Sequence, residues 1–216
     1  MVAVASAATG ASLATEAPRL EADGQRLEAD EQRLVLRGVE WKEYVILREL
    51  IDRPGLRMTY LEGALELMTP SPDHERWKTN IARLLELYAH ILRIELYGYG
   101  STTFKREAKE RGAEPDECYL IGKQLADFPE IVLEVIHTSP LLNKLEVYAG
   151  FGVAEVWLFK DGRFLLYALD RAAATYRVVQ RSGLLPALDF AMITRYAIRR
   201  DTPQALRELA AELRAG

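Results

Sequence analysis

Residues 129–137, with the sequence PEIVLEVIH, decide the fold class of this chain. Their apolar residues are mostly β-branched, which predicts a central strand buried on both faces of a sheet. Glu134 lies inside this run, and a carboxylate there costs several kcal/mol unless a cation or strong donors meet it. A structural ion pair is the ordinary use of such an acid. Glu134 also stands near the carboxyl end of its strand, where α/β sites usually form.

The segments on either side of this strand alternate between helical and strand patterns. They predict an α/β domain with a mixed β-sheet flanked by helices, preceded by an N-terminal helix and a hairpin. We expect helices over residues 41–51, 71–92, 139–150 and 202–216, strands over 97–106, 117–122 and 175–180, and hairpins around Glu62-Gly63 and Asp161-Gly162.

Composition limits the classes of function. The 216 residues include 28 Lys plus Arg and 32 Asp plus Glu, and the net charge of -4 excludes a strongly basic nucleic-acid coat protein. The single cysteine, Cys118, excludes an internal disulfide and a Cys-rich zinc site, which favours a reducing cytoplasm. No apolar run is long enough to span a bilayer, and the N-terminus is a poor signal peptide. We therefore expect a cytoplasmic protein without a membrane partner.

Residues 1–34 differ from the rest of the chain. They are rich in small residues and then repeat Arg-Leu at positions 19, 26 and 33. One apolar position per heptad is too few for a coiled coil, so we expect a flexible low-complexity tail or a weak helical extension. Residues 35–216 are predicted to form a single domain.

Asp116 is the second candidate acid, at the start of the strand predicted before that of Glu134. Pro-Asp is a common turn dipeptide, so Asp116 alone is more often a turn residue than a functional one. Two acids on neighbouring strands can nevertheless direct hard oxygen ligands at one point. This arrangement suits Mg²⁺, which prefers carboxylates and retains several waters.

Two basic side chains are predicted near these acids. Lys144 lies beside the apolar stripe of the helix that follows Glu134 and can reach back toward the sheet, although a lysine whose stem covers apolar surface is about as common. His74 lies in the first turn of the long helix. We expect a neutral ring there that accepts a proton, although packing or capping is the commoner use. Glu62 and Glu75 are interpreted as turn and first-turn acids.

The remaining basic residues and motifs are less specific. A basic patch could contact phosphates, but a run of charge is usually a solvated face. The chain has no P-loop, GxGxxG, HExxH, GxSxG or paired CxxC motif, which argues against a nucleotide-binding enzyme. The basic residues expected near the site are Lys105, Arg106, Lys109, Arg111, Arg76 and Lys78.

Four segments carry a resemblance to a known family. They are MTYLEGALELMTPSPDHERWKTNI, YGYGSTTFKRE, EPDECYLIG and EIVLEVIHTSPLLNKLEVYAGFGVAEVWLF, in this order. From roughly residue 35 to 190 the chain resembles the putative restriction endonuclease family common in cyanobacteria. That family adopts the PD-(D/E)XK nuclease fold, so the resemblance implies a restriction endonuclease-like domain.

The resemblance also implies roles for individual residues. Pro115-Asp116 matches the Pro-Asp pair whose acid binds the metal, and Glu134 matches the second acid. Ile136 stands where the lysine of the motif is usual, and Lys144 on the next helix is the candidate to replace it. The Ser-Pro-x-His segment of the family falls on Ser71, Pro72 and His74.

Together these patterns predict a Mg²⁺-dependent endodeoxyribonuclease, with Mn²⁺ as a possible substitute. Asp116 and Glu134 would bind the metal, Lys144 would stabilise charge or orient water, and His74 would assist proton transfer or contact phosphate. The alternative is an inactive nucleic-acid-binding or scaffold module on the same fold. Homodimerisation is expected by analogy alone, because many nuclease folds cut two strands as dimers.

Overall fold

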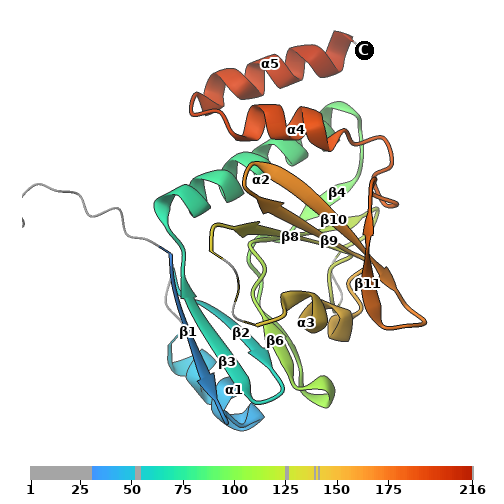
Figure 1. The fold of residues 1–216 in the computed structure, drawn as a ribbon. Helices are drawn as coiled ribbons and strands as arrows, with labels where there is room; N and C mark the ends of the chain where they lie inside the picture. The colour runs from blue at the N-terminus through green and yellow to red at the C-terminus, as the bar shows by residue number, and fades with distance from the viewer. Residues whose placement is uncertain (1–30, 52–54, 125–126, 139, 141, 216) are drawn as a thin grey trace, which may run out of the picture.

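The computed structural model describes residues 31–51, 55–124, 127–138, 140 and 142–215 (Figure 1). The chain forms two sheets and five α-helices within this described part. The strands are β1 (Gln32–Arg37), β2 (Arg57–Leu61), β3 (Ala64–Thr69), β4 (Leu96–Gly98), β5 (Phe104–Arg106), β6 (Arg111–Ala113), β7 (Glu117–Ile121), β8 (Ile131–Ile136), β9 (Glu155–Lys160), β10 (Arg163–Asp170) and β11 (Thr175–Val179). The helices are α1 (Trp41–Leu50), α2 (Pro72–Ile91), α3 (Lys144–Phe151), α4 (Phe190–Ala197) and α5 (Thr202–Ala215), with a short 3-10 turn, η1 (Glu107–Lys109).

The larger sheet has six strands in the order β11-β10-β9-β8-β7-β4. Strands β8 and β9 pair in parallel and the other neighbours are antiparallel, so the sheet is mixed as expected. All six residues of β8 are buried, which confirms the prediction of a central strand covered on both faces. The α/β fold class is therefore confirmed.

Helices cover both faces of this sheet. Helices α2, α4 and α5 pack on one face through a core that includes Leu84, Leu133 and Ile193. Helix α3 covers the opposite face through a second core that includes Val132, Val147 and Val156 (Figure 1). Alternate residues of β8 thus enter different cores, as the period of a strand requires. None of the described helices combines the length and hydropathy needed to cross a bilayer.

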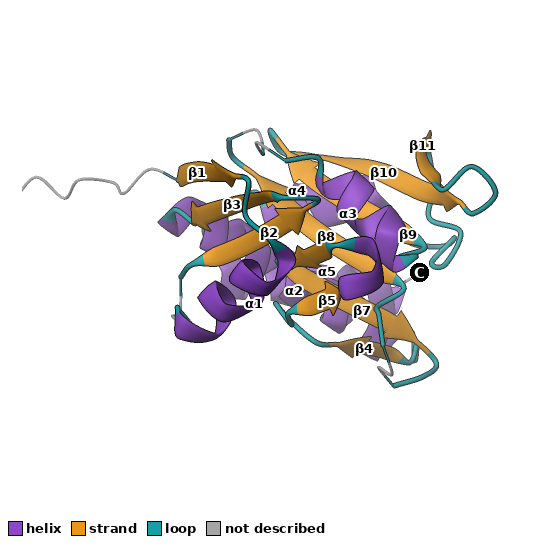
Figure 2. Cartoon of the chain, turned by 90° about the horizontal axis from the view of Figure 1, so that it is seen from below, coloured by secondary structure: helices purple, strands orange, loops and turns teal. Residues whose placement is uncertain are grey.

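The smaller sheet has five strands in the order β1-β3-β2-β6-β5. Helix α1 packs on one of its faces (Figure 2). At this contact the rings of Tyr44 and Tyr60 stack with their centres 4.8 Å apart. The chain leaves this sheet after β6 and enters the larger sheet at β7. Residues 114–116 therefore connect the two sheets, and this connection carries Asp116.

Both predicted hairpins are present. Glu62 and Gly63 connect β2 to β3 with φ angles of 44° and 86°, and Asp161 and Gly162 connect β9 to β10 with 50° and 69°. Two consecutive positive φ angles define the turn whose twist matches the flanking strands. Glycine at the second position adopts this conformation without a steric penalty.

Several boundaries differ from the sequence-based expectation. Residues 32–34 were expected to belong to the tail, but they are part of the folded domain, because Gln32–Arg37 form β1 and pair with β3. The rest of the expected tail, residues 1–30, lies outside the described residues. Helix α3 begins at Lys144 rather than near Pro140, because the side chain of Asn143 caps it by accepting from the Glu146 amide. The expected cap Ser139 lies outside the described residues.

The segment expected as one strand over residues 97–106 is divided between β4 and β5, which belong to different sheets. Gly100, with a φ of +56°, lies between them at the change of direction. The following segment, for which the sequence predicted no helix or strand, contains η1 and β6, and α4 was not expected either. These differences depend on pairing partners that are distant in sequence, which local patterns do not report.

The close approach of Tyr44 to β6 generates a stability prediction. A Cβ at Gly112 would lie 2.1 Å from the hydroxyl oxygen of Tyr44 and 2.5 Å from its Cζ. Because the tyrosine ring is buried and stacked, it cannot move away cheaply. We expect Gly112→Ala to lower the free energy of unfolding by about 1–3 kcal/mol in urea denaturation.

Gly183→Ala is the matched control, since its Cβ would come no nearer than 3.4 Å to the Glu155 carboxylate. A Gly112→Ala protein as stable as the control protein would contradict this packing.

Candidate active site

Asp116 and Glu134 lie side by side where the two sheets meet. The antiparallel register pairs Glu117 with Leu133 and Cys118 with Val132, so the next position places Asp116 beside Glu134. Directly opposite residues share one face of a sheet, and here it is the face that α3 covers. The side chains of both acids are buried, Asp116 at 1% and Glu134 at 0% exposure. The structure therefore brings together the two acids that the sequence singled out.

Glu134 is held by two side chains of α3. Lys144 donates from Nζ to Oε2 at 2.6 Å, and the hydroxyl of Tyr148 donates to Oε1. Burial raises the pKa of Glu134, although the Lys144 ammonium opposes this shift. Burial alone would lower the pKa of Lys144, but the charges of Glu134 and Asp116 outweigh it and raise that pKa. Lys144 thus directs its ammonium at Glu134, and Ile136 remains in the apolar interior.

Asp116 accepts from two different elements. The Nε2 of His74, in the first turn of α2, lies 2.9 Å from Oδ1, and the amide of Val135 donates to Oδ2 at 2.8 Å. Burial disfavours the charged carboxyl, but hydrogen bonding from His74 and the charges of His74 and Lys144 outweigh it. Together they lower the pKa of Asp116 to about 2. Asp116 is therefore an anion at neutral pH.

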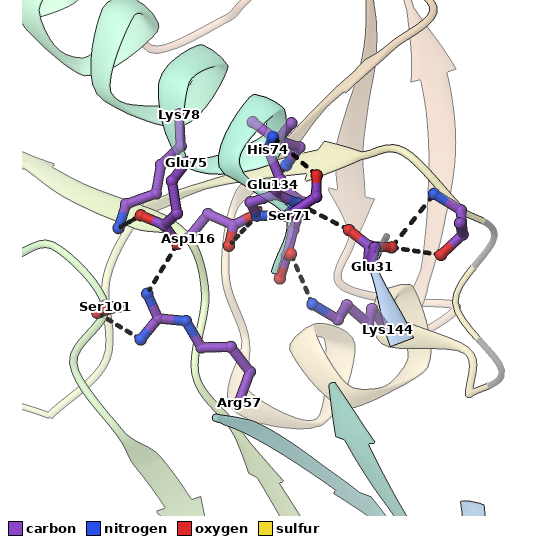
Figure 3. A network of polar contacts seen from close by, with 12 residues as sticks. Glu31, Arg57, Ser71, His74, Glu75, Lys78, Ser101, Asp116, Glu134 and Lys144 are labelled. Carbon is purple, nitrogen blue, oxygen red and sulfur yellow. Dashed lines mark hydrogen bonds and ion pairs between the residues drawn. The ribbon is translucent and has the colours of Figure 1, made fainter. Parts of the chain in front are cut away.

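His74 bridges two carboxylates, as Figure 3 shows. Its Nδ1 lies 2.9 Å from Oε2 of Glu31, and its ring is fully buried. Burial would lower the pKa of the ring, but the hydrogen bonds and charges of Asp116 and Glu31 outweigh it and raise it to about 9. The expectation of a neutral ring is therefore wrong: the position at a helix N-terminus matters less than the two acids. With its pKa raised in this way, His74 is expected to carry a proton on both ring nitrogens at neutral pH and to donate to both acids.

Several residues of this network are not identified by local sequence patterns. Glu31 falls in the segment expected to be a tail, and no local pattern singles out Tyr148. Only its spacing of four from Lys144 could have revealed it, because residues i and i+4 share a helix face. The other missed members are Arg33 and Glu66, which form an ion pair, and Thr138, which donates to Glu31.

The described part of this network holds buried charges of both signs. Among its described members, acids outnumber bases by one when His74 is protonated: the acids are Glu31, Glu66, Asp116 and Glu134, and the bases are Arg33, His74 and Lys144. A proton on Glu134 or a bound cation can meet this surplus.

The side chains of this site could hold a divalent metal only if waters or substrate phosphate completed its coordination. In the described part of the chain, no group of three or more His, Cys, Asp or Glu side chains could hold a metal ion. A metal enclosed by protein ligands alone is therefore a poor fit. Mg²⁺ is commonly bound by one or two carboxylates completed by waters and substrate phosphate, and Asp116 and Glu134 are the residues that could hold it.

The expected basic patch is mostly paired. Arg106 donates to the carbonyl oxygen of Gly150 at 2.9 Å, and Arg111 contacts Glu62 and the carbonyl oxygen of Glu146. Both arginines, with Lys109, line a cavity of about 640 Å³ on the outer side of α3. Lys105 is exposed on β5.

On α2, Arg76 pairs with Asp73, and Lys78 pairs with Glu75, which also faces Arg57 at 3.8 Å. Glu75 and Glu62 thus serve in surface ion pairs near the ends of their elements.

Comparison with known proteins places this geometry in context. A family model described as "Uma2: Putative restriction endonuclease" matches residues 41–194, a range that contains His74, Asp116, Glu134 and Lys144. A solved structure of a putative nuclease belonging to DUF820, from Anabaena variabilis ATCC 29413, is similar at 12% identity. The alignment covers 77% of this chain and 98% of that chain, with a TM-score of 0.43. No curated protein matches the chain.

The raised pKa of His74 predicts a pH dependence of stability. The folded pKa of about 9 exceeds the ordinary value of 6.5, so the stabilisation is fully present below about pH 6.5 and is lost as the pH rises through 9. In urea denaturation, the stability difference between wild type and His74→Gln should shrink by up to about 3 kcal/mol between pH 6 and pH 9.5, roughly the range set by these two values. A difference that stays constant across this range would show that His74 is not a buried cation.

Proposed function

We propose that this chain, which belongs to the Uma2 family described as "Putative restriction endonuclease", is a metal-dependent endonuclease that hydrolyses phosphodiester bonds in DNA. The metal would be Mg²⁺, with Mn²⁺ as a substitute. The observation that carries the proposal is the adjacent pair of buried acids, Asp116 and Glu134, with the Lys144 ammonium beside them. Maintaining two carboxylates in a protein interior is costly unless positive charge is available.

Each site residue has a role that follows from its contacts. Asp116 and Glu134 would hold the ion, which supplies a water of lowered pKa and polarises the scissile phosphate when bound. Lys144, charged and within 2.6 Å of Glu134, is placed to stabilise negative charge that develops on the phosphate. His74 orients Asp116 rather than accepting a proton, because both of its ring nitrogens already donate to acids.

DNA as substrate is supported by the family description and by the basic cavity beside α3. Arg106, Lys109 and Arg111 line that cavity, and α3 also carries Lys144, so phosphates bound there would lie near the helix of the site. A homodimer would place two such sites on the two strands of a duplex, a proposal made by analogy. The single buried Cys118 fits the reducing cytoplasm in which we expect the protein to act.

One observation favours an inactive nucleic-acid-binding module instead. Every carboxylate oxygen of Asp116 and Glu134 already accepts from a protein donor, among them His74 and Lys144. Such a network could serve stability alone. A module of this kind would bind DNA in a salt-dependent way without binding divalent metal.

Replacement of the two acids separates these functions. We expect Glu134→Gln and Asp116→Asn to reduce Mg²⁺-dependent cleavage of plasmid and single-stranded DNA by at least about 100-fold, the size of losing one electrostatic contact to a transition state. Glu130→Gln is the matched control. This residue precedes the same strand and pairs with Lys123 at its surface, so its replacement should leave cleavage unchanged.

Equal cleavage by the wild type and both site variants, from preparations purified in parallel, would refute the assignment of these acids. Absence of cleavage by the wild type in both Mg²⁺ and Mn²⁺, with salt-dependent DNA binding retained, would establish the inactive module.

A further inference from the structure

Glu31 lies before the region that the family model matches, yet its side chain is part of the candidate site. It stands directly before β1, the edge strand of the smaller sheet. Only 1% of its side chain is exposed. A carboxylate buried this deeply requires hydrogen-bond donors or a counter-charge, because burial of an unpaired acid is costly.

Three elements fix the Glu31 carboxylate. Its Oε2 faces Nδ1 of His74 at 2.9 Å, at the start of α2. Its Oε1 accepts from Nε of Arg33 at 3.0 Å and from the amide of Thr138 at 3.2 Å, and the hydroxyl of Thr138 also donates to it. Because both of its oxygens accept hydrogen bonds, the carboxylate of Glu31 is held in a single orientation.

The orientation of Glu31 is transmitted to Asp116 through one ring. The partner of one histidine nitrogen sets the direction of the other, and here Nε2 of His74 points at Oδ1 of Asp116 at 2.9 Å. The second oxygen of Asp116 is fixed by the amide of Val135 at 2.8 Å. Groups that orient a ligand in this way commonly change metal affinity when they are removed.

We infer that Glu31 is a positioning residue, which fixes the ring of His74 and through it the carboxylate of Asp116. The segment before the family-matched region therefore completes the site. The inference rests on the proposed role of Asp116 as a metal ligand. It predicts that loss of Glu31 weakens metal binding although Glu31 touches neither metal nor substrate.

The test uses the full chain and Mn²⁺ alone as the probe, measured by isothermal titration calorimetry. We expect Glu31→Ala to raise the dissociation constant for Mn²⁺ by about 10–100-fold. Glu31→Gln keeps one oxygen that can accept from His74, so its dissociation constant should lie between those of wild type and Glu31→Ala. It also guards against a folding defect specific to the alanine variant.

Glu155→Ala is the control for a general loss of stability. Glu155 is another buried acid, which accepts from the indole nitrogen of Trp157 at 2.8 Å and from the amide of Gly183 at 2.6 Å. Its partners lie outside the site network, so its replacement should destabilise the protein and leave Mn²⁺ affinity unchanged.

A second measurement needs no metal. The chain has 3 histidines, so the ring N–H signals in a protein labelled with ¹⁵N-histidine are few. We expect the Nε2–H signal of His74, protected by its bond to Asp116, in wild type and Glu31→Gln, and its loss in Glu31→Ala.

The outcomes separate this inference from the function on which it rests. Wild-type Mn²⁺ affinity together with an intact His74 signal in Glu31→Ala would overturn the role of Glu31 and leave the proposed function standing. A loss of affinity in Glu155→Ala as large as in Glu31→Ala would overturn it too, because stability would then be the cause. Absence of Mn²⁺ binding by the wild type would overturn the proposed function and, with it, this role.

Discussion

Two carboxylates held against each other inside a sheet are the constraint on which the site depends. Asp116 and Glu134 repel one another, and burial makes that repulsion stronger than it would be in water. Donors from His74, Lys144, Tyr148 and the Val135 amide reduce this cost without removing it. Replacing a buried ionic cluster by apolar residues is often neutral or stabilising, and the retention of these acids is therefore the basis for proposing a cation as their partner.

The fold brings these groups together from distant parts of the chain. Asp116 lies on the connection between the two sheets, Glu134 lies in β8, and Lys144 begins α3, while His74 arrives from α2 on the other side. Lys144 follows Glu134 by ten residues and reaches its carboxylate from the next helix. One turn of helix thus supplies both donors to Glu134, since Tyr148 follows Lys144 by four residues.

The sequence predicts the parts of this site that depend on local pattern. Glu134 stands out because it interrupts an apolar strand, and Lys144 because it lies beside a helix stripe. The long helix and both hairpins follow from their Ser-Pro and Gly signals. Glu31 could not be found in this way, because the repetitive sequence around it is typical of a flexible tail. Its partners His74 and Thr138 lie 43 and 107 residues further along the chain. The charge of His74 was mispredicted for the same reason: a helix terminus is visible in sequence, whereas two acids meeting one ring are not.

A crystal structure determined with Mn²⁺, whose anomalous signal locates the ion, tests most directly whether Asp116 and Glu134 bind a metal. We expect one peak at about 2.1 Å from oxygens of both acids, with Lys144 turned away from the oxygen it now contacts. A structure with DNA-free protein in saturating Mn²⁺, no peak at these acids and the Lys144–Glu134 contact intact would contradict it, and the acids would then serve the fold alone.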